Sequence, residues 1–276
     1  MPDSKLIEGY LRGADLRGAD LHDVDLAGRD LTGADLHGAD LIGADLRSAI
    51  LREVNLAGAN LAGANLAGAD ATGADLTGAN VFANLTGASL AGATLTGADL
   101  GNANLRGAYL ERAQAWDVIL RGADLRGANL AGAHLGGANL EETDLRHANL
   151  TGAHLENANL IDADLRGANL AGADLLHADL SGALAQANLA GASLPGANLS
   201  QATLLDTDMR GACLEGANFD NADLRGADLR DANLIDARLD GARMAGANLE
   251  GARMGGAHLR AAEQDNDDED GQGLSM

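Results

Sequence analysis

Residues 11–46 read LRGADLRGADLHDVDLAGRDLTGADLHGADLIGADL and repeat one five-residue phrase, A-(D/N)-L-x-G. If the leucine is position i, alanine stands at i−2, aspartate or asparagine at i−1, and a glycine-rich pair at i+1 and i+2. The phrase recurs as far as Leu259. A fixed period of this kind indicates a stack of similar structural units.

A period of five excludes both a continuous helix and a continuous strand. In a helix, leucines five apart would rotate by about 140° from one to the next and would point in all directions. In a strand, an odd period would send successive leucines to opposite faces. The chain must therefore turn within every five residues.

A short extended segment followed by a bend satisfies the pattern. Residues i−2 and i then point inward as Ala and Leu, while the Asp or Asn between them points outward. Glycine at i+2 permits the bend. Four bends close a square coil of twenty residues, and coils stack about 4.8 Å apart through backbone hydrogen bonds. Each coil buries its leucines only against its neighbours, so many coils are needed.

These residues resemble the pentapeptide-repeat family over nearly the whole chain, Leu6–Leu259. The resemblance implies an all-β fold, a right-handed quadrilateral β-helix. Counting leucine positions gives 16, 21 and 15 repeats on three stretches, 52 in all. This predicts about thirteen coils and a rod of about 60 Å. We expect an N-terminal cap at residues 1–10, the β-helix at 11–260 and an acidic, disordered tail at 261–276.

Two places shorten the period by one residue. The first is Val81 to Leu85, and the second lies between Ser181 and Leu189. For the second we place Ala185 at position i with Gln186 as a lone turn residue. An alternative with Leu184 at position i gives the same number of repeats.

Three residues at the inward i−2 position are polar. Thr143 and Thr207 replace alanine and require local hydrogen-bond partners. Arg29 would place an unpaired charge inside, which is costly. We favour an escape of Arg29 at a distorted corner over an internal ion pair.

The composition points to a basic protein as partner. Net charge is −22 at a pI of about 4.4, so the surface repels nucleic acid and anionic membranes. The chain has one cysteine, Cys213, which excludes an internal disulfide framework. It has no apolar run long enough to span a membrane and no signal-peptide pattern at its N-terminus, so we expect a cytoplasmic protein.

No motif indicates catalysis, so we predict a non-enzymatic protein without a cofactor. No glycine-rich loop opens a helix, and a filled solenoid offers no pocket. His134, His154 and Asp174 all occupy i−1 and stand twenty residues apart, which would stack them in successive coils. They are a hypothetical metal site. A plain surface ladder is the favoured interpretation, and no metal site is predicted.

An acidic belt surrounds the first coils and is a candidate docking surface for a basic protein. Its aspartates all occupy i−1, and the candidate partner-binding set is Asp15, Asp20, Asp25, Asp35, Asp40, Asp45 and Asp75. The alternative is structural, because a short Asp or Asn satisfies backbone groups in tight bends. Asn55 and Asn60 occupy the same position, which favours that alternative.

Four apolar residues stand where polar ones are expected: Phe82, Tyr109, Trp116 and Ile119. Outward aromatic side chains often anchor interfaces, so Tyr109 and Trp116 are candidate partner-binding residues. The alternative is a local bulge at residues 113–119 that tucks Trp116 against its own coil.

The resemblance implies a sharper function. The family includes proteins that resemble B-form DNA, bind DNA gyrase, a type II topoisomerase, and protect against quinolone antibiotics or toxins. Residues 1–260 carry a net charge of −16, far fewer charges than a duplex has over about 60 Å. The chain also lacks the long loops of some gyrase-protecting members. We therefore predict an acidic rod that binds a protein partner, with gyrase suspected. The alternative is a scaffolding solenoid without a topoisomerase role, and a homodimer is left open.

Overall fold

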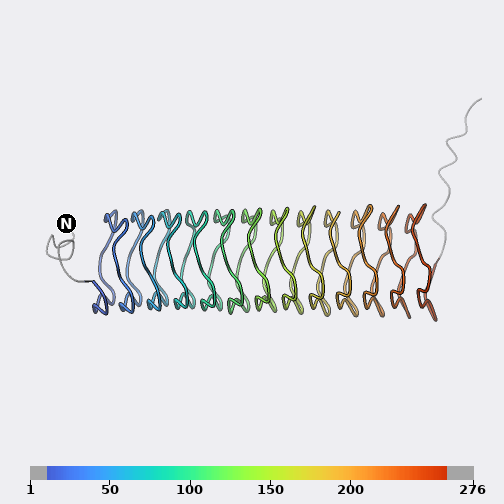
Figure 1. Ribbon diagram of the computed structural model, residues 1–276, viewed down its shortest axis with the longest axis horizontal. Coiled ribbons are helices and arrows are strands. Elements are labelled where there is room, and N and C mark those ends of the chain that lie inside the picture. The colour runs from blue at the N-terminus through green and yellow to red at the C-terminus, as the bar shows by residue number, and fades with distance from the viewer. Residues whose placement is uncertain (1–10, 260–276) are drawn as a thin grey trace, which may run out of the picture.

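The computed structural model describes residues 11–259, which form a long rod of stacked coils (Figure 1). Residues 11–259 contain no helix and no strand longer than one bridged residue. Each repeat instead contributes a single parallel bridge at i−1 and, with two exceptions, a two-residue turn at i+1 and i+2. The chain therefore turns within every repeat, as the period of five requires.

Backbone hydrogen bonds fix the register between successive coils. Asp15 bridges Asp35 in parallel, twenty residues later. The Leu16 N–H donates to the Asp35 carbonyl at 2.7 Å, and the Asp35 N–H donates back to the Ala14 carbonyl at 2.9 Å. The Gly18 N–H adds a third bond, to the His37 carbonyl at 2.9 Å. Four repeats complete one coil, so the rod has four faces.

We name the four faces by their columns of bridged i−1 residues and count residues i−2 to i+2 of each repeat with its face. The faces follow one another around the coil in the order A, B, C, D. The columns are, for face A, 15, 35, 55, 75, 94, 114, 134, 154, 174, 193, 213, 233 and 253; for face B, 20, 40, 60, 80, 99, 119, 139, 159, 179, 198, 218, 238 and 258; for face C, 25, 45, 65, 84, 104, 124, 144, 164, 184, 203, 223 and 243; and for face D, 30, 50, 70, 89, 109, 129, 149, 169, 188, 208, 228 and 248.

Every full corner is a tight turn with a left-handed residue at i+2. At one corner the Ala34 N–H donates to the Leu31 carbonyl at 2.8 Å, and Gly33 between them has φ of 66°. Glycine has no Cβ to clash in this conformation, which explains its recurrence at i+2. Where another residue stands there it is most often Asp or Asn, the residues that tolerate left-handed φ best.

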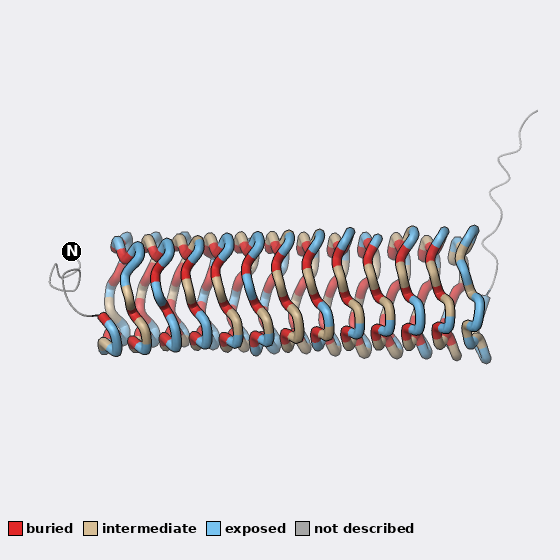
Figure 2. Tube along the Cα trace, viewed as in Figure 1, coloured by how far each residue is buried: buried red, intermediate tan, exposed pale blue. Residues whose placement is uncertain are grey.

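The interior is a continuous column of buried leucine and alanine side chains, as the spacing predicted. Buried residues recur in coil after coil along the rod (Figure 2). Leu31, Leu36 and nearly all later leucines at position i have no more than 2% of their surface exposed. Phe219 is the largest of the fully buried side chains. Because this column excludes water along the rod, chemistry is confined to the outer walls.

The two short steps fall where the sequence placed them. Asn65 bridges Asn84 and Asn169 bridges Asn188, each nineteen residues apart instead of twenty. At the second step Ala185 is buried while the Leu184 side chain is 39% exposed and occupies the bridged position. The alternative with Leu184 at position i is therefore wrong. One turn residue is lost at each place without disturbing the columns.

The three polar residues at i−2 have two different environments: the threonines are buried and the arginine is exposed. Thr143 and Thr207 are fully buried, and their hydroxyls donate to the carbonyls of Leu120 at 3.0 Å and Ala185 at 2.5 Å. Arg29 is exposed, which confirms that its charge escapes the interior. The corner is not distorted, because the Arg29 N–H still donates to the Leu26 carbonyl at 3.0 Å. Arg29 lies near the start of the described chain, and the i−2 position one coil earlier on face D lies outside the described residues.

The expected N-terminal cap at residues 1–10 and the acidic tail at 261–276 lie outside the described residues. The count of thirteen coils begins at Leu6, also outside them, and stays a prediction. Within residues 11–259, no helix is long and apolar enough to cross a membrane.

A pair of glycine substitutions separates backbone strain from crowding. A Cβ would meet nothing within 4 Å at either Gly58, with φ of +64°, or Gly255, which lacks a positive φ. Gly58→Ala should lower the free energy of unfolding by about 1–2 kcal/mol, because alanine is strained in the left-handed region. Gly255→Ala should leave it nearly unchanged. Urea unfolding of both variants checks this, and equal losses would show that the left-handed corner is not the constraint.

Candidate functional site

Negative charge is distributed unequally over the four faces. Face A carries eight acidic residues and two arginines, and face B carries ten and two. Face C carries seven of each, and face D carries eight acidic residues and six arginines, counting Arg12 of the partial repeat 11–13 that precedes Asp30 on this face. The net charges are therefore −6, −8, 0 and −2. Faces A and B are adjacent, so one side of the rod holds −14 of the −16 on residues 11–259.

The aspartates of the predicted belt all have a structural task. Each accepts a hydrogen bond at Oδ1 from the backbone N–H two residues later, as Asp25 does from Ala27 at 3.0 Å and Asp75 from Thr77 at 2.9 Å. Asparagines in the same columns do the same, as Asn55 does from Ala57 at 3.1 Å. The turn-satisfying alternative is thus correct for Oδ1. The charge itself is not needed for this bond, since asparagine makes it too.

The belt residues lie on different faces. Asp15, Asp35 and Asp75 share face A, Asp20 and Asp40 share face B, and Asp25 and Asp45 share face C. Fewer of the belt aspartates keep an unpaired negative charge, because arginines form ion pairs with some of them. Arg17 contacts Asp15 at 2.7 Å and Asp35 at 3.6 Å, and Arg47 contacts Asp45 at 2.5 Å. The hydrogen bond from Arg17 lowers the pKa of Asp15 to about 2.

Face C is neutral because arginines at i+1 alternate with aspartates at i−1 along the rod axis. Arg126 lies 2.5 Å from Asp124 and 3.3 Å from Asp144 of the next coil. Arg146 repeats the arrangement, 2.6 Å from Asp144 and 3.5 Å from Asp164. Hydrogen bonds from the neighbouring guanidinium groups hold the pKa values of these aspartates below the usual range. From Asp124 to Arg166, face C thus pairs its charges within the face.

The four exposed apolar residues do not form one patch, which corrects the sequence-based grouping. Phe82 lies at the corner between faces B and C, Tyr109 on face D, Trp116 at the corner between faces A and B, and Ile119 on face B. Their side chains are 40–52% exposed. Phe82 and Ile119 thus count with face B, Trp116 with face A and Tyr109 with face D, so closeness along the chain did not indicate a shared surface.

Trp116 does not sit in a bulge. The bridges Gln114↔His134 and Ile119↔Asn139 continue through this stretch without interruption. The indole stacks instead on His134 of the next coil, with ring centroids 4.9 Å apart. His134 stacks in turn on His154 at 4.7 Å. Neither the exposed interface anchor nor the local bulge predicted from the sequence included this contact. The spacing of eighteen residues between Trp116 at i+1 and His134 at i−1 of the next coil could have indicated it.

The hypothetical metal site has no support among residues 11–259. His134, His154 and Asp174 do occupy successive coils of face A. However, no group of three or more His, Cys, Asp or Glu residues in the described chain is arranged to hold a metal ion. The histidine rings lie 9° from parallel, so they face each other instead of converging on one point.

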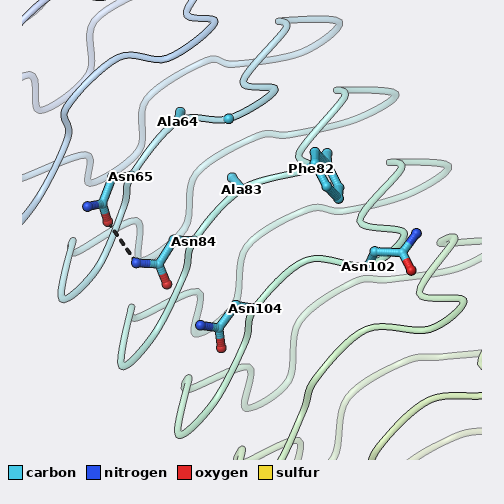
Figure 3. Close-up of a pocket in the computed structure, with 8 residues that line it drawn as sticks. Ala64, Asn65, Phe82, Ala83, Asn84, Asn102 and Asn104 are labelled. Atoms are coloured by element: carbon cyan, nitrogen blue, oxygen red, sulfur yellow. Dashed lines mark hydrogen bonds between the residues drawn. The ribbon is translucent and has the colours of Figure 1, made fainter.

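A surface notch of about 340 Å³ opens where the first short step removes a turn residue (Figure 3). Phe82 and Asn102 border one side, and Asn65, Asn84 and Asn104 form a column on the other. Asn84 donates to the Asn65 side-chain oxygen at 3.0 Å. No titratable side chain lines this notch. The notch could therefore accommodate part of a binding partner, but it has no side chain for acid–base catalysis.

Comparisons with known proteins identify the family. The family model described as pentapeptide repeats (8 copies) matches residues 3–28, 10–47, 49–81, 83–122, 108–146, 119–157, 148–184, 184–221 and 217–260. The chain belongs to the pentapeptide-repeat family. The four-faced coil of residues 11–259 agrees with the quadrilateral β-helix that the resemblance to this family implied.

Solved structures of other members are similar in sequence to different degrees. HetL, a pentapeptide repeat protein involved in heterocyst differentiation regulation in the cyanobacterium Nostoc sp. strain PCC 7120, is 32% identical. The match covers 92% of this chain and 93% of that one, with a TM-score of 0.26.

Two further structures extend the comparison. Full-length QnrB1, a plasmid-mediated fluoroquinolone resistance protein, is 17% identical over 80% of this chain and 91% of that one, with a TM-score of 0.26. Rfr23 from the cyanobacterium Cyanothece 51142 is 30% identical over 47% of this chain and 88% of that one, with a TM-score of 0.21. No curated protein matches the chain.

The arginine ladder of face C makes a testable contribution to stability. Arg146→Met should lower the urea midpoint at neutral pH, because it removes contacts to Asp144 and Asp164. Arg106→Met is the matched control at the same position of face C, beside the uncharged Asn104. It should have a smaller effect.

The same pair of variants has an expected pH dependence. The aspartate pKa values are lowered in the folded protein, so the ion-pair stabilisation is complete above the ordinary value of 3.8. It is lost as the pH falls through the lowered folded values. The difference between Arg146→Met and the unchanged protein should therefore shrink below pH 3.8. A difference that is constant with pH would contradict the ion-pair account.

Proposed function

We propose that this pentapeptide-repeat protein is a non-enzymatic, cytoplasmic binding protein whose faces A and B dock on a basic protein surface. The observation that carries the proposal is the concentration of −14 on two adjacent faces. Complementary potentials of this kind steer association and fix the orientation of partners. The neutral face C and nearly neutral face D would point away from the partner.

The partner we consider first is DNA gyrase, at the basic surface on which it binds DNA. A rod of about 60 Å with −14 on one side presents about one charge per 4 Å, whereas a duplex has one per about 1.7 Å. The rod would then engage a basic groove along one edge and would not replace every phosphate contact. Its binding should weaken as salt screens the charges.

A second candidate is a regulatory or scaffolding contact with another basic protein. The specific observation in its favour is the match to HetL over nearly the full length of both chains, since HetL is described as involved in heterocyst differentiation regulation. The acidic faces serve this role equally well. Gyrase assays therefore have to be paired with a general test of the acidic faces.

Variants on different faces test the role of faces A and B. Asp20→Asn, Asp40→Asn and Asp75→Asn together remove three charges from them, while asparagine keeps the turn hydrogen bond. The matched control removes three charges from face C through Asp124→Asn, Asp144→Asn and Asp164→Asn. Titrated into a gyrase supercoiling assay with and without a fluoroquinolone, the unchanged protein should inhibit gyrase or rescue it from the drug at micromolar concentration.

The two triple variants should then differ in this assay. The face A and B triple should require a higher concentration for the same effect, and the face C triple should act like the unchanged protein. No effect of the unchanged protein at tens of micromolar excludes the gyrase tested. Equal losses for both triples would contradict a one-sided docking surface and favour a dependence on total charge alone.

A further inference from the structure

One stack of aromatic rings interrupts the acidic faces. It consists of Trp116, His134 and His154, which come from three successive coils and lie along the rod axis on face A. The indole and the first imidazole are inclined by 25°, and the two imidazoles by 9°. Trp116 starts the stack at the corner where face A meets face B and remains 40% exposed. The stack therefore lies on the more acidic side of the rod.

Gly136 lies against the indole. It does not have a positive φ, unlike the glycines at i+2. A Cβ there would lie 3.4 Å from Trp116 Cδ1 and 3.6 Å from Glu156 Oε2. Glu156 also contacts His154, with Oε1 and Nδ1 3.3 Å apart. The indole of Trp116 and the carboxylate of Glu156 thus lie next to the same glycine. Asp117 follows Trp116 directly in the chain.

The stack marks one position along a surface that otherwise repeats. Acidic residues recur along faces A and B from Asp15 to Asp240, so electrostatic attraction alone gives a basic partner several similar axial positions. Trp116 is the only tryptophan of the chain. A contact with this ring would fix the axial register of the partner.

We propose that the stack is the anchor for an arginine side chain in a basic segment of the protein partner. Arginine fits because its planar guanidinium stacks on indole and donates hydrogen bonds to carboxylates at the same time. Trp116 supplies the ring, Glu156 supplies a carboxylate over the same glycine, and Asp117 supplies a second over the adjoining Gly137. This inference rests on the proposed docking of faces A and B and adds the point at which that docking is fixed.

The test uses the full chain and a fluorescently labelled oligoarginine peptide. Binding is followed by peptide anisotropy, and the emission of the single tryptophan reports contact at the stack. Trp116→Ala should weaken binding about threefold or more, the range expected for a cation on an exposed indole. Tyr109→Ala is the matched control, because Tyr109 is an aromatic residue that is 51% exposed on face D. It should bind like the unchanged protein.

The outcomes separate this inference from the proposed function. Weaker binding by the triple variant of Asp20, Asp40 and Asp75, together with unchanged binding by Trp116→Ala, overturns the anchor and leaves the acidic docking surface standing. Equal weakening by Trp116→Ala and Tyr109→Ala also overturns the anchor. Binding that no variant changes overturns both proposals. Unfolding curves for each variant establish that it is folded under the conditions of the binding measurement, so a loss of affinity does not come from unfolding.

Discussion

The left-handed residue at i+2 is the constraint on which the rest of the molecule depends. It lets the chain turn a corner in two residues, so the next i−2 side chain again points inward. The same corner aligns the N–H and C=O groups of each face with those of the neighbouring coil, as in the bonds that join Leu16 to Asp35. A solenoid of this kind distributes its stability over contacts between neighbouring coils. The leucine side chains fill the interior, but they point inward in every repeat only because the chain turns at each corner.

This construction separates the interior from the surface. Positions i−2, i and i+2 serve packing and turning, whereas i−1 and i+1 face outward and vary widely. The i−1 side chain needs only one acceptor atom for its turn hydrogen bond, which aspartate and asparagine both provide. Charge can therefore be added or removed on one face without a structural change. The balanced face C and the acidic faces A and B use the same backbone and differ in these outward positions and in acidic residues at i+2, such as Asp23 and Asp117.

Much of the fold follows from the sequence because one local rule repeats. The period placed the buried leucines, the exposed Asp column and both short steps, including the choice of Ala185 over Leu184. The surface was harder to predict because neighbours on the rod are eighteen to twenty residues apart in the chain. Phe82, Tyr109, Trp116 and Ile119 look clustered along the sequence but are spread over faces A, B and D. The stacking of Trp116 on His134 joins residues of two successive coils, and no propensity of Trp116 itself indicates it.

The two short corners also have a mechanical meaning. Each full repeat makes three hydrogen bonds to a neighbouring coil, and all of them run along the rod axis, as those from Leu16, Gly18 and Asp35 do. A force that pulls the ends of the rod apart is therefore shared by every such bond between two coils. The repeats at Val81 and Ala185 have no i+2 residue and so lack one of these bonds. Under tension, the coils next to Phe82 and Gln186 are where the rod should part first.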